Sequence, residues 1–203
     1  MNVPELKELT FEEERHIYCL NGNKIPSVTT IMRPLSNAMY GSVDEEILNK
    51  AAARGTAVHN AIENYSLFGI EDIDERYEGY FKAYKSWAKE HKLNIVANEI
   101  RTYHKSMLYA GTADMIAEVD GKLLLIDFKT SASINRMLTG VQLEAYAKAF
   151  ESHGFSVDGK AILHLKSDGL YEWKIYEKND YESWEVFGSL MVVHNHIQKY
   201  KRR

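Results

Sequence analysis

Residues 111–129 read GTADMIAEVDGKLLLIDFK. Apolar and β-branched residues on both sides of Asp120-Gly121 predict two strands, because Asp-Gly is a strong signal for the two-residue turn of a type I′ hairpin. If these two residues form the turn, Val119 pairs with Lys122, and the pairing of every other position on the two strands follows. The rest of the chain can be placed around this hairpin.

The predicted register brings two carboxylates together. Asp114 falls opposite Asp127, and Lys129 shares their face because side chains alternate with a period of two. At a separation of ~5 Å and an effective dielectric constant near 20, the repulsion costs roughly 3 kcal/mol. A cation would offset it, and hard oxygen donors suit Mg²⁺ or Mn²⁺. The alternative, a surface ion pair of Asp127 with Lys129, fits less well because the apolar run 123–126 predicts a buried strand.

Hydrophobic periodicity predicts helices before, between and after strands, which argues for an α/β or α+β layer fold. Strands are expected at residues 95–104, 111–119, 122–129, 161–166 and 170–176, after an N-terminal hairpin that turns at Asn21-Gly22. Helices are expected at residues 28–32, from Ser42 toward Leu67, at 74–91, at 141–153 and from Asn179 to the C-terminal end. Ser42 with Glu45, and Asn179 with Glu182, have the spacing of capping boxes.

Composition narrows the class of protein. The 203 residues, 45% of them hydrophobic, fit one globular domain, with a helical part at about 28–91, a sheet core at about 95–176 and a C-terminal helix at about 180–203. A net charge of −4 excludes a polybasic coating protein but allows a local basic groove. The single Cys19 excludes a four-cysteine iron–sulfur cluster. We expect a cytoplasmic protein without a signal peptide or membrane span.

Four short motifs occur in a characteristic order: Gly55-Thr56-x-x-His59, Gly111-Thr112-x-Asp114, Asp127-x-Lys129-Thr130 and Gln142-x-x-x-Tyr146. The N-terminal hairpin at Asn21-Gly22, with Pro26-Ser27-Val28-Thr29, adds to them, and together these pieces cover roughly residues 16 to 176. At these residues the sequence resembles the PD-(D/E)XK nuclease superfamily, specifically the branch of RecB-type nuclease domains, Cas4-like proteins and phage exonucleases. Each motif alone is weak, whereas four in order are a strong signal.

The resemblance implies a restriction-endonuclease-like core, in which helices flank a central mixed β-sheet, and metal-dependent hydrolysis of phosphodiester bonds. It implies that His59, Asp114, Asp127 and the backbone carbonyl of Phe128 bind Mg²⁺ or Mn²⁺. Lys129 matches the lysine that positions the attacking water and stabilises the charge that develops on the phosphate. Asp114, Asp127 and Lys129 are then the catalytic residues.

Further residues have two interpretations. Gln142 and Tyr146 match a pair that lines the site near the substrate backbone, but Thr139 and Gln142 also have the spacing of a capping box, and Tyr146 could be a core residue. His59 could be a packed helix histidine. Glu99, on the first strand of the sheet, could approach the metal or remain a solvated acid.

Two groups outside the motifs could contact nucleic acid. Tyr77, Tyr80, Tyr84 and Trp87 could stack on bases, although their helical spacing favours packing in the core. The basic tail 199–203 could contact phosphates or be only a solvated helix end.

We therefore predict a Mg²⁺- or Mn²⁺-dependent deoxyribonuclease, an exonuclease of phage or bacterial DNA recombination and repair. Its substrate would be single-stranded or duplex DNA ends, and a recombination protein is a candidate partner. The alternatives are a structure-specific endonuclease with the same site and an inactive nucleic-acid-binding module. The intact set of two acids and a lysine argues against the inactive module.

Overall fold

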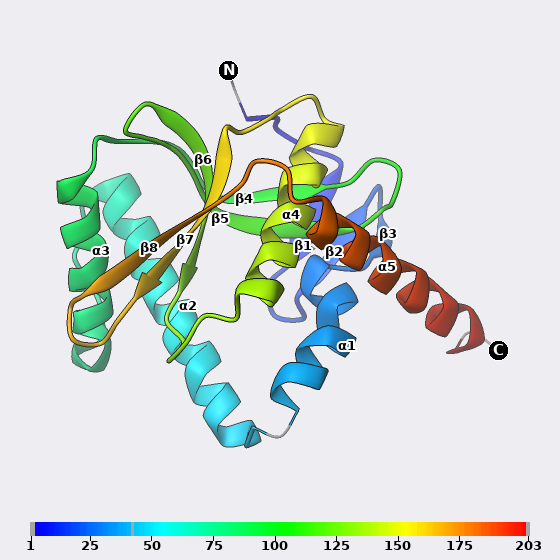
Figure 1. The fold of residues 1–203 in the computed structure, drawn as a ribbon, viewed down its shortest axis with the longest axis horizontal. Coiled ribbons are helices and arrows are strands. Elements are labelled where there is room, and N and C mark those ends of the chain that lie inside the picture. Colours follow the sequence, from blue (N-terminus) through cyan, green and yellow to red (C-terminus); the bar gives the residue numbers. More distant parts are fainter. Residues whose placement is uncertain (1–2, 42, 202–203) are drawn as a thin grey trace.

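A five-stranded sheet with helices on both faces forms the centre of the computed structural model, which describes residues 3–41 and 43–201 (Figure 1). The strands are β1 (Leu9–Glu12), β2 (Ile17–Leu20), β3 (Asn23–Ile25), β4 (Leu93–Tyr103), β5 (Ala110–Val119), β6 (Lys122–Lys129), β7 (Gly159–Leu165) and β8 (Tyr171–Tyr176). The helices are α1 (Val28–Tyr40), α2 (Glu45–Phe68), the 3-10 helix η1 (Glu75–Tyr77), α3 (Glu78–Glu90), α4 (Arg136–Ser152) and α5 (Tyr181–Lys201).

The central sheet is mixed, in the order β4-β5-β6-β7-β8. Only β6 and β7 pair in parallel, because α4 carries the chain from the end of one to the start of the other. The other neighbouring strands are antiparallel. This arrangement confirms the predicted α/β fold with a mixed sheet between helices, and it is consistent with a restriction-endonuclease-like core.

The predicted register of the β5–β6 hairpin is confirmed from its turn to the pair Met115 and Ile126. The paired ladder ends at that pair. Asp114 and Asp127 therefore lie one position beyond it, at the point where β6 continues beside β7. The backbones of Asp114 and Asp127 are therefore not paired with each other.

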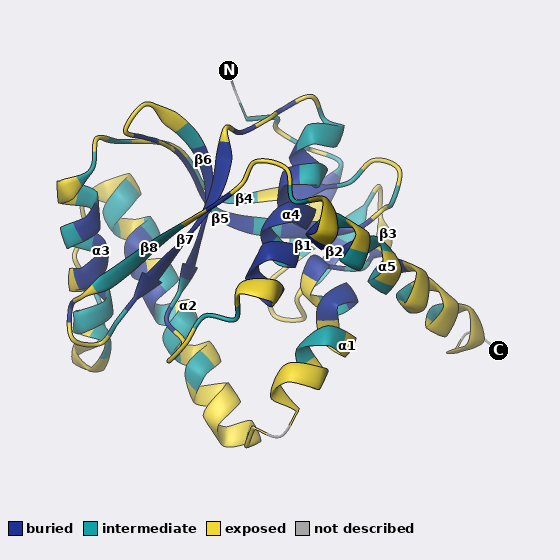
Figure 2. Ribbon diagram, in the orientation of Figure 1, coloured by how far each residue is buried: buried dark blue, intermediate teal, exposed yellow. Residues whose placement is uncertain are grey.

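Both faces of the sheet are buried, which explains the continuous apolar run in β6 (Figure 2). One face carries Ile116 and Leu125 and packs against α1, α4 and α5. The opposite face carries Met115 and Ile126 and packs against α2 and α3. The end of β6, which carries site residues, is therefore packed between two hydrophobic cores, one on each face of the sheet.

The aromatic stripe of α3 belongs to the second core. Tyr84 is 1% exposed and Trp87 is 0% exposed, and both lie on the side of α3 that packs against the sheet. Core packing, the favoured interpretation of their helical spacing, is confirmed. These two rings are not available to stack on nucleic-acid bases.

The N-terminal hairpin is also confirmed, with Asn21 and Gly22 at φ 48° and 77° in its turn. A third strand, β1, was not predicted and pairs with β2. The small sheet packs against β4 through the buried Tyr18 and Tyr103, and the Tyr103 hydroxyl donates a hydrogen bond to Glu8 Oε1 at 2.8 Å. The N-terminal segment is thereby fixed beside the central sheet.

One predicted helix start and one predicted helix cap are wrong. Helix α4 begins five residues before the predicted start at Val141, since Asn135 Oδ1 accepts the backbone N–H of Leu138 at 3.1 Å. Thr139 lies inside the helix, so its capping-box interpretation is also wrong. Asp180, not Asn179, caps α5 and accepts the backbone N–H of Ser183 at 3.0 Å.

The first helices also differ from the prediction. Helix α1 continues well past Met32 to Tyr40, through Pro34. Asp44 caps α2 and accepts the backbone N–H of Glu46 at 2.7 Å. The predicted cap, Ser42, lies outside the described residues. Within residues 3–41 and 43–201, no helix has both the length and the hydropathy to cross a membrane.

Candidate metal centre and active site

His59 connects α2 to the end of the β5–β6 hairpin. It follows Val58 on the helix face that packs on the sheet, which directs its ring toward Phe128. His59 Nδ1 lies 3.5 Å from Asp114 Oδ1, and Nε2 lies 3.1 Å from the backbone carbonyl oxygen of Phe128. The structure therefore brings together three of the four predicted metal-binding groups.

Asp114 and Glu99 complete a cluster of donor atoms with His59. One ligand atom from each of the three residues lies within 4.8 Å of the others. Asp114 is oriented by the backbone N–H of Phe128, which donates to Oδ2 at 2.6 Å. Of the two interpretations of Glu99, the structure supports proximity to the predicted metal site.

Glu99 reaches this cluster from an irregular part of β4. It lies between Asn98 and Ile100, which pair with β5, and so faces Asp114. Its φ of 45° is rare for a residue other than glycine. Backbone strain of this kind is common at functional sites, where the surrounding structure maintains it.

Asp127 is not a member of the three-residue cluster. Its side chain is buried, and Oδ2 lies 2.7 Å from Lys129 Nζ. The predicted ion pair of these two residues is therefore present, but it is at the buried end of a strand rather than on the surface. A metal-binding role for Asp127 stays a prediction.

Lys129, Gln142 and Tyr146 form a hydrogen-bonded chain. Lys129 Nζ donates to Gln142 Oε1 at 3.0 Å, and Gln142 Nε2 donates to the Tyr146 hydroxyl at 3.2 Å. The Tyr146 ring also explains Gly111, because a Cβ at that position would lie 2.4 Å from Tyr146 Cε1. Motif residues of β5, β6 and α4 are thus in direct contact with one another.

Burial and charge shift the pKa values of the cluster. Burial alone would lower the pKa of His59, but the charge and hydrogen bond of Asp114 outweigh it and raise that pKa to about 9. Burial, with the charge of Asp114, raises the pKa of Glu99 to about 7. Burial also raises the pKa of Asp127 to about 6, although Lys129 opposes the shift. Shifted groups that lie close together make these residues candidates for a functional site.

These shifts predict how the stability of the metal-free protein depends on pH. His59, Glu99 and Asp127 each have a higher pKa in the folded protein than their ordinary values of 6.5, 4.5 and 3.8. Each therefore contributes stability that is present below its ordinary pKa and is lost as the pH rises through its folded pKa. In EDTA, we expect the melting temperature to fall between pH 5 and pH 9.

Thermal unfolding of the wild type and of Asp114→Asn, each in EDTA at several pH values, checks this prediction. The Asp114→Asn variant removes the charge that raises the pKa of His59. Its melting temperature should therefore depend less on pH between 7 and 9. A wild-type melting temperature that rises from pH 6 to pH 9 would contradict the prediction.

Two cavities flank the chain of Lys129, Gln142 and Tyr146. A cavity of about 590 Å³ contains the three-residue cluster and extends to the N-terminal sheet. A second cavity, of about 450 Å³, lies beside Lys129 and Gln142 and is lined by α1, the start of α2 and residues 131–135. In Figure 1, α1 and α2 extend past the sheet as two arms on this side.

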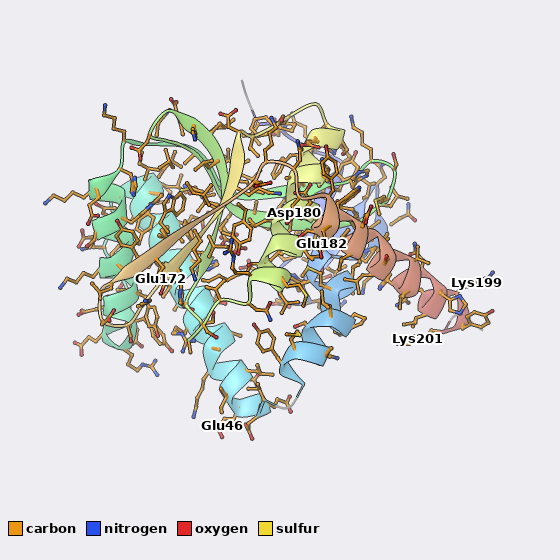
Figure 3. The ribbon with its side chains drawn as sticks, in the orientation of Figure 1. Glu46, Glu172, Asp180, Glu182, Lys199 and Lys201 are labelled. Carbon is orange, nitrogen blue, oxygen red and sulfur yellow. The ribbon has the colours of Figure 1, made fainter. Side chains whose placement is uncertain are left out.

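The C-terminal tail lies far from these cavities. Figure 3 shows Lys199 and Lys201 at the outer end of α5, away from the sheet. Arg202 and Arg203 lie outside the described residues. The cationic residue that sequence reasoning missed is instead Arg101, which lines the larger cavity. Its place two residues after Glu99 on a strand could have indicated this, because such residues share a face.

Comparisons with known proteins assign the chain to a family. A search of curated protein sequences gave no match. One of the similar solved structures, "Crystal structure of SSO0001", is 14% identical, with a TM-score of 0.37, over 80% of this chain and 84% of that chain. The sequence profile of the PD-(D/E)XK nuclease superfamily matches residues 41–199, most of the chain and all four motifs. The chain belongs to the PD-(D/E)XK nuclease superfamily.

Proposed function

We propose that this protein is a Mg²⁺- or Mn²⁺-dependent deoxyribonuclease, which hydrolyses phosphodiester bonds in the larger cavity. The observation that best supports this proposal is the cluster of His59, Glu99 and Asp114, whose donor atoms lie within 4.8 Å of one another. Lys129 and Asp127 lie beside this cluster. Metal-dependent hydrolysis of a phosphodiester uses a metal site, a group that orients water and space for the substrate, and these residues could supply all three.

The donor set fits a hard divalent cation. His59 Nε2 and the carbonyl oxygen of Phe128, which lie 3.1 Å apart, offer a nitrogen and an oxygen donor, and Asp114 and Glu99 offer carboxylates. We propose that these four groups hold the ion, and that Asp127 is a further ligand, as the family resemblance implies. The ion would polarise the phosphate and lower the pKa of a bound water.

Lys129 is proposed to act on the water and the phosphate. Burial alone would lower the pKa of its ammonium group, but Asp127 and Asp114 outweigh it and raise that pKa, so the group stays charged at neutral pH. Asp127 and Gln142 hold Nζ from two directions. A fixed ammonium group can orient the attacking water and offset the negative charge that develops in the transition state. Gln142 and Tyr146 then position Lys129 and contact the substrate backbone.

The Lys129→Ala variant separates this role from metal binding. We expect its cleavage rate to fall by about 10²–10³-fold, the usual cost of losing one preorganised donor. Its affinity for Mn²⁺ should stay within a few-fold of the wild type, because Lys129 is not a ligand. Single-turnover cleavage and isothermal titration with Mn²⁺ measure the two quantities. Cleavage at the wild-type rate would remove Lys129 from the mechanism.

We further propose that the enzyme is an exonuclease, of the RecB-type, Cas4-like and phage branch, that acts in DNA recombination or repair. In this proposal the arms α1 and α2, which border the second cavity beside Lys129, would surround a strand that enters by its end. Closed single-stranded circles and linear strands of equal length, each incubated with Mn²⁺, test this proposal. An exonuclease degrades only the linear strands, whereas equal rates would identify an endonuclease.

A further inference from the structure

The larger cavity has a second wall that the proposed chemistry does not use. Besides the cluster of His59, Glu99 and Asp114, it is lined by Phe11 and Tyr18 of the N-terminal sheet, by His16 in the turn between β1 and β2 and by Arg101 of β4. The superfamily profile begins at residue 41, so Phe11, His16 and Tyr18 lie outside the matched region. None of the four motifs contains a residue of this wall.

The N-terminal sheet holds this wall close to the acid cluster. The buried Tyr18 forms a hydrogen bond of 2.8 Å with Thr112 Oγ1, two residues before Asp114 on β5. The backbone N–H of Ala110 donates to the carbonyl of Pro26 at 2.9 Å. The aromatic residues are thus fixed relative to the cluster, as a preorganised binding surface requires.

The rings form one aromatic group. The centroids of Phe11 and Tyr18 are 4.5 Å apart, and the ring of the exposed His16 meets both at nearly right angles, at 5.1 and 5.6 Å. His16 has a φ of 51°, a backbone conformation that is uncommon outside glycine. Phe11 is half-buried and lines the cavity.

Arg101 adds a cation to the aromatic group. Its guanidinium lies 5.3 Å from the centre of the Phe11 ring. Glu13, Glu63 and Glu99 line the same cavity. Across residues 3–41 and 43–201, however, no carboxylate forms an ion pair with Arg101. An exposed guanidinium without a carboxylate partner is free to form the paired hydrogen bonds that it makes with phosphate.

The position of Arg101 matches the geometry of a nucleic-acid strand. Arg101 pairs with Thr112 across β4 and β5, and each is two residues from an acid of the cluster, Glu99 or Asp114. Two residues of a strand span about 6.6 Å. This length is comparable to the separation of successive phosphates in an extended single strand. A scissile phosphate at the cluster would therefore place the next phosphate near Arg101.

We propose that Phe11, His16 and Arg101 form a subsite for the unpaired nucleotide next to the scissile phosphate. Arg101 binds the neighbouring phosphate, and the exposed His16 ring, supported by Phe11, stacks on the base. Stacking on protein rings requires a base that is not paired or stacked in a duplex. This inference rests on the proposed nuclease function and gives its substrate as a single-stranded end.

Steady-state kinetics with single-stranded DNA test the subsite. We expect Phe11→Ala and Phe11→Leu to raise KM by about 10-fold, since both remove the ring that holds His16 in place for stacking. Phe11→Leu keeps an apolar side chain in the small sheet, and thermal unfolding verifies that each variant is folded. The kcat of both variants should stay within about two-fold of the wild type, because they leave the acid cluster and Lys129 intact.

Salt dependence isolates the phosphate contact. Arg101→Ala should raise KM and lower the slope of log KM against log salt by about 0.7, the value for one phosphate contact to a single strand. Arg101→Lys keeps the charge and should restore the slope. Lys199→Ala, at the outer end of α5, and Phe68→Ala, on an exposed ring at the end of α2, are the matched controls and should leave both quantities unchanged.

The outcomes separate the two proposals. If the wild type does not cleave DNA with Mn²⁺, the proposed function itself fails. If the wild type cleaves and the folded Phe11 and Arg101 variants keep the wild-type KM and salt slope, only the subsite is overturned. A raised KM in the Phe11 and Arg101 variants, with unchanged controls, supports the subsite.

Discussion

The Asp114→Asn variant is expected to reduce the rate of DNA cleavage by about 10³-fold or more. It removes a negative charge that would attract the metal ion to the cluster of His59, Glu99 and Asp114. Asp114 accepts the backbone N–H of Phe128 at 2.6 Å, and Oδ1 lies 3.5 Å from His59. An asparagine oxygen can still accept the first of these hydrogen bonds. The backbone geometry should therefore survive while the affinity for Mn²⁺ falls.

Three measurements on this variant distinguish the loss of metal from the loss of fold. Isothermal titration should show weaker binding of Mn²⁺, and circular dichroism should show an unchanged fold. The pKa of His59, followed by NMR in metal-free buffer, should fall from about 9 toward its ordinary value of 6.5. Cleavage near the wild-type rate would exclude Asp114 from the metal site.

The Glu144→Ala variant is expected to lower the free energy of unfolding by about 3–5 kcal/mol, the cost of leaving a buried charge without its partner. Lys160 of β7 and Glu144 of α4 are both buried, and Lys160 Nζ donates to Glu144 Oε2. The same oxygen accepts the backbone N–H of Asp180 at 3.3 Å. This buried pair joins the sheet to α4, which carries Gln142 and Tyr146.

Urea denaturation measures the effect, and a double variant is its control. Glu144→Leu combined with Lys160→Met removes both charges and keeps apolar volume, so its stability should be near that of the wild type or higher. Unlike Glu144→Ala, it leaves no buried charge unpaired. A change below about 1 kcal/mol in Glu144→Ala would mean that Lys160 finds another partner or reaches water.

The hairpin at the centre of the site could be predicted because its signals are local. The Asp-Gly turn fixes the register of β5 and β6, and the period of two places Asp114 and Lys129 on one face. The sequence does not show that the ladder ends at Met115 and Ile126. Beyond that pair β6 continues to Lys129 beside β7, a segment distant in the sequence, with which it pairs from Leu124 onward.

Glu99 shows where strand periodicity is not enough. The pairing of β4 with β5 shifts between Ile95 and Ala97, and Glu99 itself has a φ of 45°. Neither irregularity has a signal in the local sequence. Its contact with the cluster is therefore known only from the pairing of the folded strands.

The start of α4 shows a conflict between local preference and packing. Gly140 lowers the helix propensity of the segment by about 1 kcal/mol relative to alanine. In the folded chain α5 packs closely against this position, and a Cβ there would lie 3.0 Å from Ser183 Oγ. The close approach of two helices explains the glycine, and it cannot be predicted from either segment alone.

The most direct test of the account is the digestion of end-labelled linear single-stranded DNA by the wild type with Mn²⁺, with EDTA, and by Asp114→Asn with Mn²⁺. We expect cleavage only by the wild type with Mn²⁺. Cleavage in EDTA, or equal cleavage by Asp114→Asn, would contradict a metal-dependent nuclease centred on His59, Glu99 and Asp114.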